Sequence, residues 1–299
     1  MPVWIVASIF AAFMQNLRFL LQRHLKVTTL STGGATWARF LYSAPLVAVL
    51  VLVYAGASGQ GWPGTNARFW GFVVTGGLAQ MLATACVVAL FARRNFTVGI
   101  TLKKTEVILT AGFGLLILGE AVSAPVLVAI VVGFVGVLLL SDPPKGAVPL
   151  RWRARIFNAA SGYGLASGVL FGISAVGYRG ASLALEAGDV MLRASFTLSA
   201  ATAVQTLILG LWLFLREREE IGKVVASWRV SALVGLTSMA GSLGWFIAFT
   251  LQTAALVKAV GQVELVFTFW LKERSSGKEI AGIALILVSL GIIIAGTLL

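Results

Sequence analysis

Histidine and cysteine are almost absent from this chain, which has one of each in 299 residues. Cys86 lies inside an apolar run, so the sequence offers neither a disulfide framework nor a thiolate metal site. His24 lies in a basic stretch that we expect to be a solvated loop, and a single histidine argues against histidine-based zinc sites and a Ser-His-Asp triad. A phosphate-binding loop of the G-x-x-x-x-G-K type is also missing. We therefore expect no cofactor and no activity that is driven directly by ATP.

Charged residues are scarce as well, at 11% of the chain, whereas 59% of the residues are hydrophobic and the mean hydropathy is +0.95. Apolar runs of about 20 residues recur from end to end, which is typical of an integral membrane protein. These runs are too long and too continuous for the strands of a barrel. We therefore expect the chain to cross the bilayer as helices.

Ten transmembrane helices are predicted. They are expected at residues 2–21, 32–54, 69–91, 97–118, 122–140, 159–178, 190–215, 230–252, 254–271 and 280–299. The stretch 141–158 contains paired prolines and several basic residues, so we expect a basic linker loop between a first domain, 1–140, and a second domain, 159–299. A charged connector at 216–229 is predicted to be helical. The predicted fold class is an all-α integral membrane protein.

The formal net charge of +12 follows from the loops rather than from a nucleic-acid-binding surface. Lysine and arginine gather in the loops that follow the odd-numbered spans, and the alternate loops hold almost none. Because cytoplasmic loops carry the excess of basic residues, we expect the odd-numbered loops in the cytoplasm and both termini outside. The expected partners are a small-molecule substrate and the lipid bilayer, without nucleic acid, and with the chain acting as a monomer.

The five spans before the linker match the five spans after it. The segment Phe10–Arg18 corresponds to Phe171–Arg179, Arg39 to Arg193, Glu106 to Glu264, and Glu120 to Glu273. An odd number of spans per copy forces the two copies into opposite orientations, which is the inverted-repeat plan of secondary transporters. The two glutamates of the first copy are 14 residues apart and those of the second are 9 apart. The ninth span is therefore broken or tilted differently, or some of its residues are absent from this sequence.

Two short motifs give a resemblance to a known family. The pair Arg39-Phe40 begins the second predicted span, and Leu118-Gly119-Glu120 follows the fourth. With ten spans in two five-helix repeats, these motifs resemble the EamA family of the drug/metabolite transporter superfamily over the whole chain. The corresponding motif after the ninth span is degenerate, at Lys272-Glu273, and the usual proline of the fourth span is absent. The resemblance implies a secondary transporter of the inner membrane that exports amino acids and related metabolites.

Polar and aromatic side chains recur on one face of three predicted spans. They are Gln15 and Arg18 in the first span, Gln80 and Thr84 in the third, and Ser238, Ser242, Trp245 and Phe249 in the eighth. Hydroxyls, amides and rings on inward faces suit an amphipathic substrate, so we predict that these residues line a substrate cavity between the two repeats. The alternatives are hydrogen bonds to a neighbouring helix, ordinary packing and, for Arg18, snorkelling toward the helix end.

Four charged residues lie inside predicted spans. They are Lys103, Lys104 and Glu106 in the fourth span and Glu264 in the ninth. A charge at the bilayer centre is costly, so such residues usually face a bundle interior or a wet cavity. Our hypothesis is that Glu106 or Glu264 responds to protons and that Lys103 or Lys104 attracts a substrate carboxylate. The alternative is a set of ion pairs that only pins the helices.

Small residues form a ridge on the sixth predicted span. Gly164, Gly168 and Gly172 recur every four residues, which favours close helix packing. A contact that slides during alternating access would use the same surface. Both interpretations place this ridge against another helix.

Several functions compete for this pattern. Cationic cavity candidates outnumber the two glutamates, so Coulomb attraction favours substrates that bear a carboxylate. A multidrug exporter of lipophilic cations is the main alternative. Such an exporter is expected to have a carboxylate deep in the first span, where the only charged residue is Arg18. A membrane-embedded enzyme ranks last, because no metal cluster, nucleophile elbow or catalytic carboxylate pair is evident, and a channel remains open as a possibility.

Overall fold

The computed structural model describes residues 1–93, 96–140, 158–270 and 277–298, apart from the side chains of residues 96, 97, 268–270, 279, 297 and 298. Within these ranges the chain is helical and has no strand. By length and composition, six helices could cross a membrane. They are α1 (Val3–Thr28), α2 (Thr32–Ser58), α3 (Ala67–Leu90), α8 (Ala159–Leu183), α9 (Val190–Arg216) and α11 (Trp228–Leu251). The predicted all-helical class is confirmed, and these six helices fit a membrane protein.

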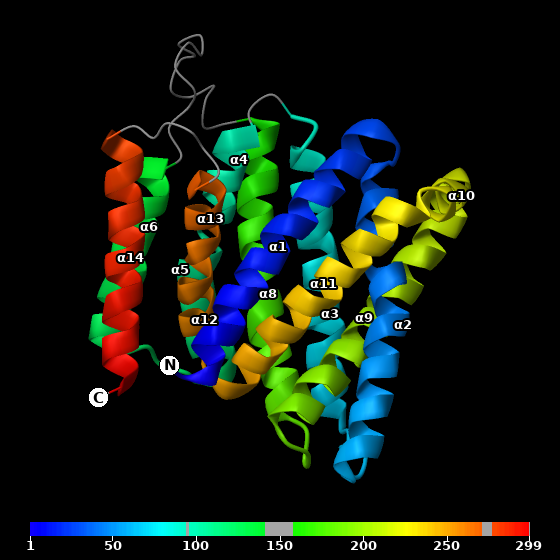
Figure 1. Cartoon of the computed structure of the whole chain (residues 1–299), viewed down its shortest axis with the longest axis horizontal. Helices are drawn as coiled ribbons and strands as arrows, with labels where there is room; N and C mark the ends of the chain where they lie inside the picture. The colour runs from blue at the N-terminus through cyan, green and yellow to red at the C-terminus, as the bar shows by residue number, and fades with distance from the viewer. Residues whose placement is uncertain (94–95, 141–157, 271–276, 299) are drawn as a thin grey trace.

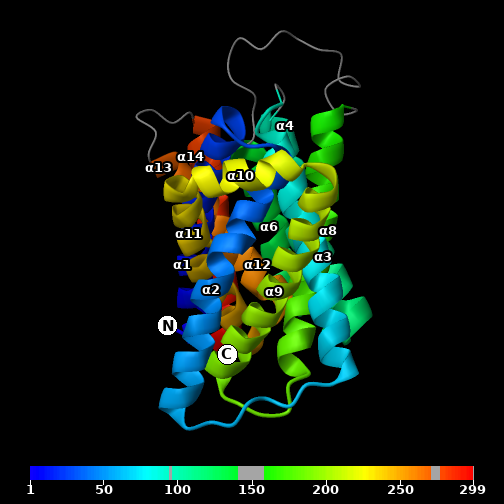
Figure 2. The same cartoon turned by 90° about the vertical axis from the view of Figure 1, so that its right-hand side faces the viewer.

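The other helical segments are shorter or interrupted. They are α4 (Phe96–Lys103), α5 (Glu106–Phe113), the π-helical turn η1 (Gly114–Leu118), α6 (Ala124–Leu140), α10 (Arg218–Ala226), α12 (Ala254–Val260), the 3₁₀ turn η2 (Gly261–Val263), α13 (Glu264–Trp270) and α14 (Gly277–Leu298). The short helix α10 lies across one end of the long helices (Figure 2). The prediction of a helical connector between the seventh and eighth spans is thus confirmed.

Two of the ten predicted spans are not continuous helices. The fourth is divided into α4 and α5 by a turn at Lys104 and Thr105, and the ninth is divided into α12 and α13 by η2. Of the explanations for the short ninth span, a break is the one found. Because of these breaks, and because α6 has only 17 residues, fewer than ten helices have the length of a simple membrane span. The predicted linker lies in 141–157, and the predicted Glu273 equivalence lies in 271–276, outside the described residues.

Side-chain caps set where several of the long helices begin. Ser31, Asn66, Asn158 and Asp189 each accept a hydrogen bond from the backbone N–H three residues later, at 3.0, 2.9, 3.1 and 2.8 Å. Such caps satisfy one of the free donors at a helix start. At the other end of α2, Gly59 has a φ of +65°, a conformation that favours glycine and stops the helix. These boundaries are therefore encoded locally.

The long helices pack in neighbouring pairs. In Figure 1, α1 and α11 run side by side diagonally across the molecule, and α6 pairs with α14 at one edge. Behind them α3 packs against α8, whose small residues allow a close approach. Both termini lie at the same end of the molecule, and α10 lies at the opposite end. The largest buried cluster lies between α1, α8, α11 and α12.

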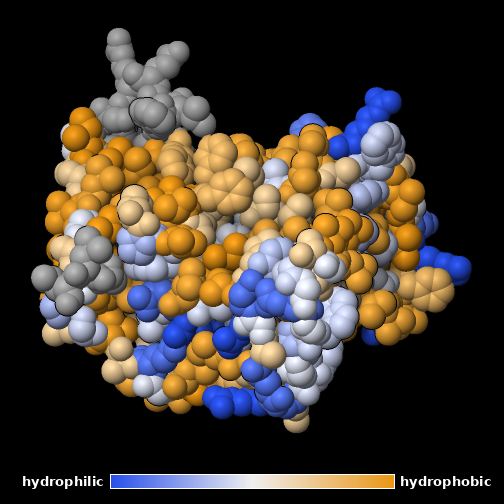
Figure 3. Space-filling model, turned by 60° about the horizontal axis from the view of Figure 1, so that its bottom comes forward, coloured by the Kyte–Doolittle hydropathy of each residue, from blue (hydrophilic) through white to orange (hydrophobic). Residues whose placement is uncertain are grey.

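Large apolar side chains cover the outer faces of the helices. Leu116, Leu207 and Leu215, for example, are 81%, 72% and 68% exposed. In Figure 3 hydrophobic residues cover most of the surface in view, and hydrophilic residues gather on the end turned toward the viewer. A soluble monomer rarely exposes so much contiguous apolar surface, so this distribution fits a protein surrounded by lipid.

Candidate functional site

A polar cavity lies between α1, α2, α3, α8, α11 and α12. Its wall is formed by Gln15, Arg18, Arg39, Gln80, Phe171, Ser174, Ala175, Tyr178, Thr237, Ser238, Gly241, Ser242, Trp245, Phe246, Phe249 and Lys258. The space open to the centre of a water molecule is only about 20 Å³, which is room for about one water. The side chains thus nearly fill the cavity in this conformation, and a molecule larger than water would enter only if they moved apart.

Arg39 is the best-anchored cation of this cavity. Its Nε donates to Ser238 Oγ at 2.9 Å, and its Nη1 donates to Thr84 Oγ1 at 2.8 Å. Its Nη2 donates to Ser242 Oγ at 3.4 Å. Arg39 is buried, and no carboxylate in the described part of the chain forms an ion pair with it. Its charge is therefore met by three hydroxyl groups and by the ring of Phe40, 5.0 Å away, but by no carboxylate of the described residues, which leaves it able to attract an anion.

The first helix adds a second guanidinium. Arg18 Nη1 donates to Gln22 Oε1 at 3.2 Å, and Gln22 Nε2 donates to the backbone oxygen of Ala35 at 3.0 Å. The guanidinium also lies over the ring of Phe19, 4.3 Å from its centroid. Arg18 is buried and, like Arg39, has no ion-pair partner among the described residues. Burial contradicts the snorkelling alternative for this residue.

Aromatic rings form the opposite part of the wall. Trp245 stacks on Phe249 with ring centroids 6.0 Å apart, and Tyr178 lies against Phe246 at 4.4 Å. The Trp245 ring also rests on Gly261 in η2, where a Cβ atom would collide with it. The indole N–H of Trp245 is buried and has no hydrogen-bond partner within the described ranges. The cavity thus combines apolar faces with an unused donor.

A network of hydrogen bonds holds the polar side chains that lie beside these rings. Gln205 Nε2 donates to Gln80 Oε1 at 3.0 Å and to the backbone oxygen of Gly77 at 2.9 Å. The Tyr178 hydroxyl donates to the same Gln80 oxygen at 2.9 Å. Both amides and the phenol are therefore held in one orientation toward the cavity.

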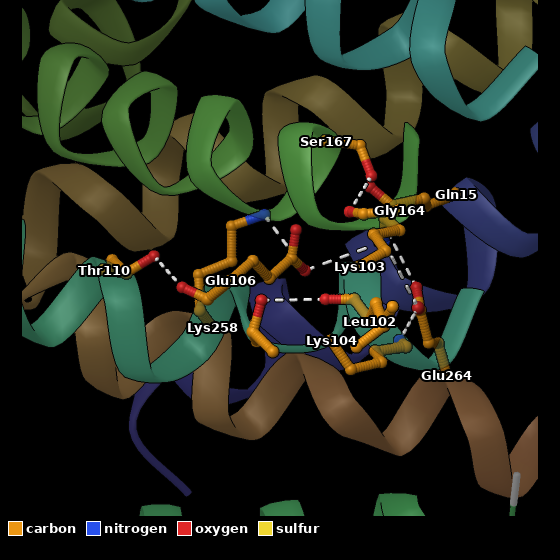
Figure 4. Close-up of polar contacts among 11 residues, drawn as sticks. Gln15, Leu102, Lys103, Lys104, Glu106, Thr110, Gly164, Ser167, Lys258 and Glu264 are labelled. Carbon is orange, nitrogen blue, oxygen red and sulfur yellow. Dashed lines mark hydrogen bonds and ion pairs between the residues drawn. The ribbon is translucent and has the colours of Figure 1, made fainter. Parts of the chain in front are cut away.

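The charged residues of the two interrupted helices meet in one cluster (Figure 4). Lys104 at the α4–α5 turn forms an ion pair with Glu264 at the start of α13. Gln15 of the cavity wall donates to the other oxygen of Glu264 at 2.7 Å. The breaks in the two helices are thus joined to each other and to α1. All three side chains are buried, so this link lies in the interior of the bundle.

Glu106 lies between two lysines in the same cluster. Its Oε1 is 3.7 Å from Lys103 Nζ and 3.8 Å from Lys258 Nζ. Its Oε2 is buried and has no hydrogen-bond partner within the described residues. Both ammonium groups also lie over the ring of Phe171, at 5.2 and 5.5 Å from its centroid. Three lysines here share two carboxylates, so the cluster carries an excess positive charge.

The glycine ridge of α8 holds the α4–α5 break in place. At the break, the backbone N–H groups of Lys104 and Thr105 donate to carbonyls three residues earlier, at 3.0 and 3.1 Å. A Cβ on Gly168 would lie 2.8 Å from Thr105 Oγ1 and 3.0 Å from the Lys103 oxygen. A Cβ on Gly164 would collide with the backbone of Gly99. Close packing of this ridge, as predicted from the sequence, is confirmed.

One arginine joins three segments of the chain at the end of the molecule where the termini lie. Arg179 Nε donates to both oxygens of Glu120, at 2.6 and 2.8 Å. Its Nη1 donates to the backbone oxygens of Phe249 and Gln252, at 2.8 and 2.6 Å. Arg179 thereby ties α8, the segment after η1 and the end of α11 together. Because Phe249 also lines the cavity, this clamp lies directly beside it.

Seven of the eight predicted cavity residues line the observed cavity. They are Gln15, Arg18, Gln80, Ser238, Ser242, Trp245 and Phe249. Thr84 does not line it but supports Arg39 from behind. Lys103, Lys104, Glu106 and Glu264 lie together in the neighbouring cluster. Sequence reasoning missed Phe171 and Tyr178 on α8, although Phe171, Ser174 and Tyr178 follow one another at helical spacing.

Comparisons with known proteins give the fold and no more. No family model matches the chain, and no curated protein matches it. A solved structure described only as "Crystal structure of protein" superposes with a TM-score of 0.64 over 96% of each chain, at 13% sequence identity. At this identity the likeness shows a shared arrangement of helices. In the described ranges, no group of three or more His, Cys, Asp or Glu side chains is placed to hold a metal ion.

Proposed function

We propose that this chain is a secondary transporter that exports amino acids or related small carboxylate-bearing metabolites by alternating access through the central cavity. The observation that carries the proposal is the charge of the cavity wall. Arg18, Arg39 and Lys258 line it, and among the described residues no carboxylate does. A carboxylate group of the substrate would supply the missing anion, and the aromatic part of the wall would contact its apolar part.

The proposed architecture is ten spans in two inverted five-helix repeats, as in the EamA family that the sequence resembles. The packing of the helices supports it. In this scheme the first repeat contains α1, α2, α3, α4–α5 and α6, and the second contains, in the same order, α8, α9, α11, α12–α13 and α14. The contact of α1 with α11 then corresponds to the contact of α3 with α8. Three further contacts each join a helix to its own counterpart in the other repeat: α2 with α9, α5 with α12, and α6 with α14. The two interrupted helices are equivalent in this scheme.

The proposed location is the inner membrane, with the odd-numbered loops in the cytoplasm. The described ends of α1 and α3 and the start of α8 lie at the same end of the molecule as α10, and the termini lie at the other end (Figure 1). This alternation supports the parity behind the charge-based orientation. The Arg179 clamp would then close the outer side, which suits an exporter at rest.

We further propose that Glu106 or Glu264 couples transport to protons and that Lys103 or Lys104 attracts the substrate carboxylate. The free oxygen of Glu106 is a place where a proton would be accepted in the interior. Glu264 contacts both Lys104 and the cavity residue Gln15, so a carboxylate that reaches Gln15 would compete with it. Such competition would loosen the link between the two interrupted helices.

Export of lipophilic cations is the weaker candidate. A cationic drug needs a carboxylate or an electron-rich cage free of competing charges, whereas three cations already line this cavity. Two ammonium groups also lie over the ring of Phe171, at 5.2 and 5.5 Å from its centroid, and would repel a further cation there. The geometry therefore favours an anionic group over a cationic one.

Counter-flow in proteoliposomes tests the proposal. Vesicles loaded in turn with amino acids, organic anions and quaternary amines would be assayed for uptake of the labelled compound. We expect accumulation of amino acids or similar carboxylates, weakened in Arg39→Gln at low substrate concentration and kept in Arg68→Gln, which removes an exposed arginine outside the cavity lining. Accumulation of the amines alone would overturn the proposal.

A further inference from the structure

A second pocket lies beside the charged cluster, in a groove between α1, α4 and α13. Its walls include Phe19 and Leu20 of α1, Ile100 of α4 and Leu265 of α13. The space open to the centre of a water molecule is about 210 Å³, far more than in the central cavity. We call it the α1–α13 groove. It is open without any movement of side chains.

The groove faces the apolar surroundings of the protein. Leu20 at its rim is 54% exposed, and Phe13 and Leu17 continue the exposed apolar stripe of α1. Phe13 and Phe267 meet edge to face at 5.6 Å and close the space between α1 and α13 beyond the groove. An acyl chain could therefore enter the groove from the lipid that surrounds α1.

The inner end of the groove is charged. Lys103, Lys104 and Glu264 line this end, so two ammonium groups face one carboxylate there, while Arg23 of the same lining is exposed. Lys103 Nζ is 3.7 Å from Glu106 and 3.8 Å from Glu264, which are long contacts for ion pairs. Both lysines are buried. A second carboxylate at this point would restore charge balance in a region from which water is largely excluded.

A second apolar pocket of the molecule serves as a control for the effect of charge in the α1–α13 groove. A larger crevice of about 330 Å³ lies between α2, α3 and α9, with Leu52, Trp62, Trp70 and Phe196 in its wall. Among the residues that the structure describes, none in its lining is charged. A lipid that binds only through its chain should occupy both pockets, whereas one that binds through an anionic head should prefer the α1–α13 groove.

We propose that the α1–α13 groove binds a free fatty acid of the bilayer, with its carboxylate at Lys103 and Lys104 and its chain along Leu20 and Ile100. The carboxylate competes there with Glu264 for the two ammonium groups. Because Glu264 also accepts a hydrogen bond from Gln15 of the cavity wall, the bound fatty acid acts on a cluster that contacts the central cavity. The site does not depend on the transport function proposed above.

Photolabelling in liposomes tests this site. The full chain would be irradiated with a diazirine derivative of palmitic acid, and the labelled peptides would be identified by mass spectrometry. We expect labelling around Leu20 and Ile100 that oleic acid reduces by about tenfold and that its methyl ester leaves in place. Ile100→Trp fills the groove and should abolish the labelling. Ala203→Trp fills the uncharged crevice and should not.

Lys103→Gln adds a charge test that keeps the Lys104–Glu264 pair, and it should weaken labelling by about tenfold. Size-exclusion chromatography of each variant confirms that the fold is kept. Equal labelling of the two pockets, equal competition by the methyl ester, or unchanged labelling in Ile100→Trp would overturn the proposal. Displacement by phosphatidylglycerol but not by oleic acid would assign the groove to a phospholipid and would also overturn it.

Discussion

Lys104 and Glu264 lie 160 positions apart in the sequence and form a buried ion pair between the two interrupted helices. Each residue lies at the point where its helix is broken, Lys104 after α4 and Glu264 after η2. The pair therefore joins the two irregular parts of the backbone. The same glutamate accepts a hydrogen bond from Gln15, so the pair also reaches the cavity wall.

Removal of one partner of this pair should destabilise the protein more than removal of both. Glu264→Gln leaves Lys104 buried without its partner, and breaking a buried pair in this way costs about 3–5 kcal/mol. The double variant Lys104→Met with Glu264→Gln should regain part of this loss. Thermal unfolding in detergent measures both. A double variant that is no more stable than Glu264→Gln alone would contradict the pairing.

Glu106→Gln tests the proton hypothesis. The substitution keeps the size of the side chain but removes the oxygen that would take up a proton. Transport by the variant should lose its dependence on external pH while some exchange activity remains. The measurement is uptake into proteoliposomes over a range of pH at fixed substrate concentration. If the pH profile of Glu106→Gln matches that of the wild type, Glu106 does not couple transport to protons.

Arg39 should set the affinity for a carboxylate. Arg39→Gln should raise the KM for the substrate by about tenfold or more, since a hydrogen bond to a charged group contributes about 1.5–3 kcal/mol. Thr84→Ala should have a smaller effect of the same sign, because it removes only a support of the guanidinium. Initial rates of uptake give both values. A change in the maximal rate alone, with KM unchanged, would argue against substrate contact.

The sequence predicts which residues line the cavity better than it predicts where the neighbouring helices are interrupted. The stripe on α11 and the polar residues of α1 face inward because lipid leaves them no other low-energy environment. The place where α4 and α5 separate is not visible in the sequence, since no proline or glycine marks Lys104 and Thr105. That break depends on packing against Gly164 and Gly168, which is a tertiary contact.

Other features of the site also escape a pattern-based prediction. Phe171 and Tyr178 lie on the helix whose glycines indicate packing, so their part in the cavity is not evident from spacing. The Arg179 clamp uses Glu120 of the Leu118-Gly119-Glu120 motif, whose partner the sequence does not give. In both cases the missing information is which helices become neighbours. The caps at Ser31, Asn66, Asn158 and Asp189, in contrast, are local and could be read directly.

Gly261 should be intolerant of a side chain. In Gly261→Ala the new Cβ would collide with the Trp245 ring, and overpacking of this kind costs about 1–3 kcal/mol. The displaced ring should also lower the transport rate, because Trp245 lines the cavity. Gly291→Ala in α14 is the matched control, since nothing lies within 4 Å of its Cβ position. Equal unfolding temperatures for the two variants would contradict the tight contact.

Glu220 should give the protein an acid-sensitive stability. This residue of α10 accepts a hydrogen bond from Ser31 N–H at 2.6 Å, at the start of α2, and one from Lys223 at 2.7 Å. Burial alone would raise the pKa of Glu220, but the bonds from Lys223 and Ser31 outweigh it and lower the pKa below its usual value.

The stability from Glu220 is therefore present above the pKa of the unfolded state and is lost as the pH falls through the lower, folded pKa. Glu220→Gln should lower the unfolding temperature near neutral pH and should reduce the further loss on acidification. Thermal unfolding between about pH 7 and pH 3 measures this. Wild type and variant that lose stability in parallel over this range would exclude Glu220 as the source.

The central claim is that the cavity recognises a carboxylate. Its most direct test is counter-flow of a labelled amino acid and of the amine left by its decarboxylation, measured in the same preparation of proteoliposomes. The two compounds share the side chain and the ammonium group and differ only in the carboxylate. The account predicts that the amino acid accumulates, that Arg39→Gln weakens this accumulation at low substrate concentration, and that the amine does not accumulate. Accumulation of the amine to an equal or greater level would contradict it.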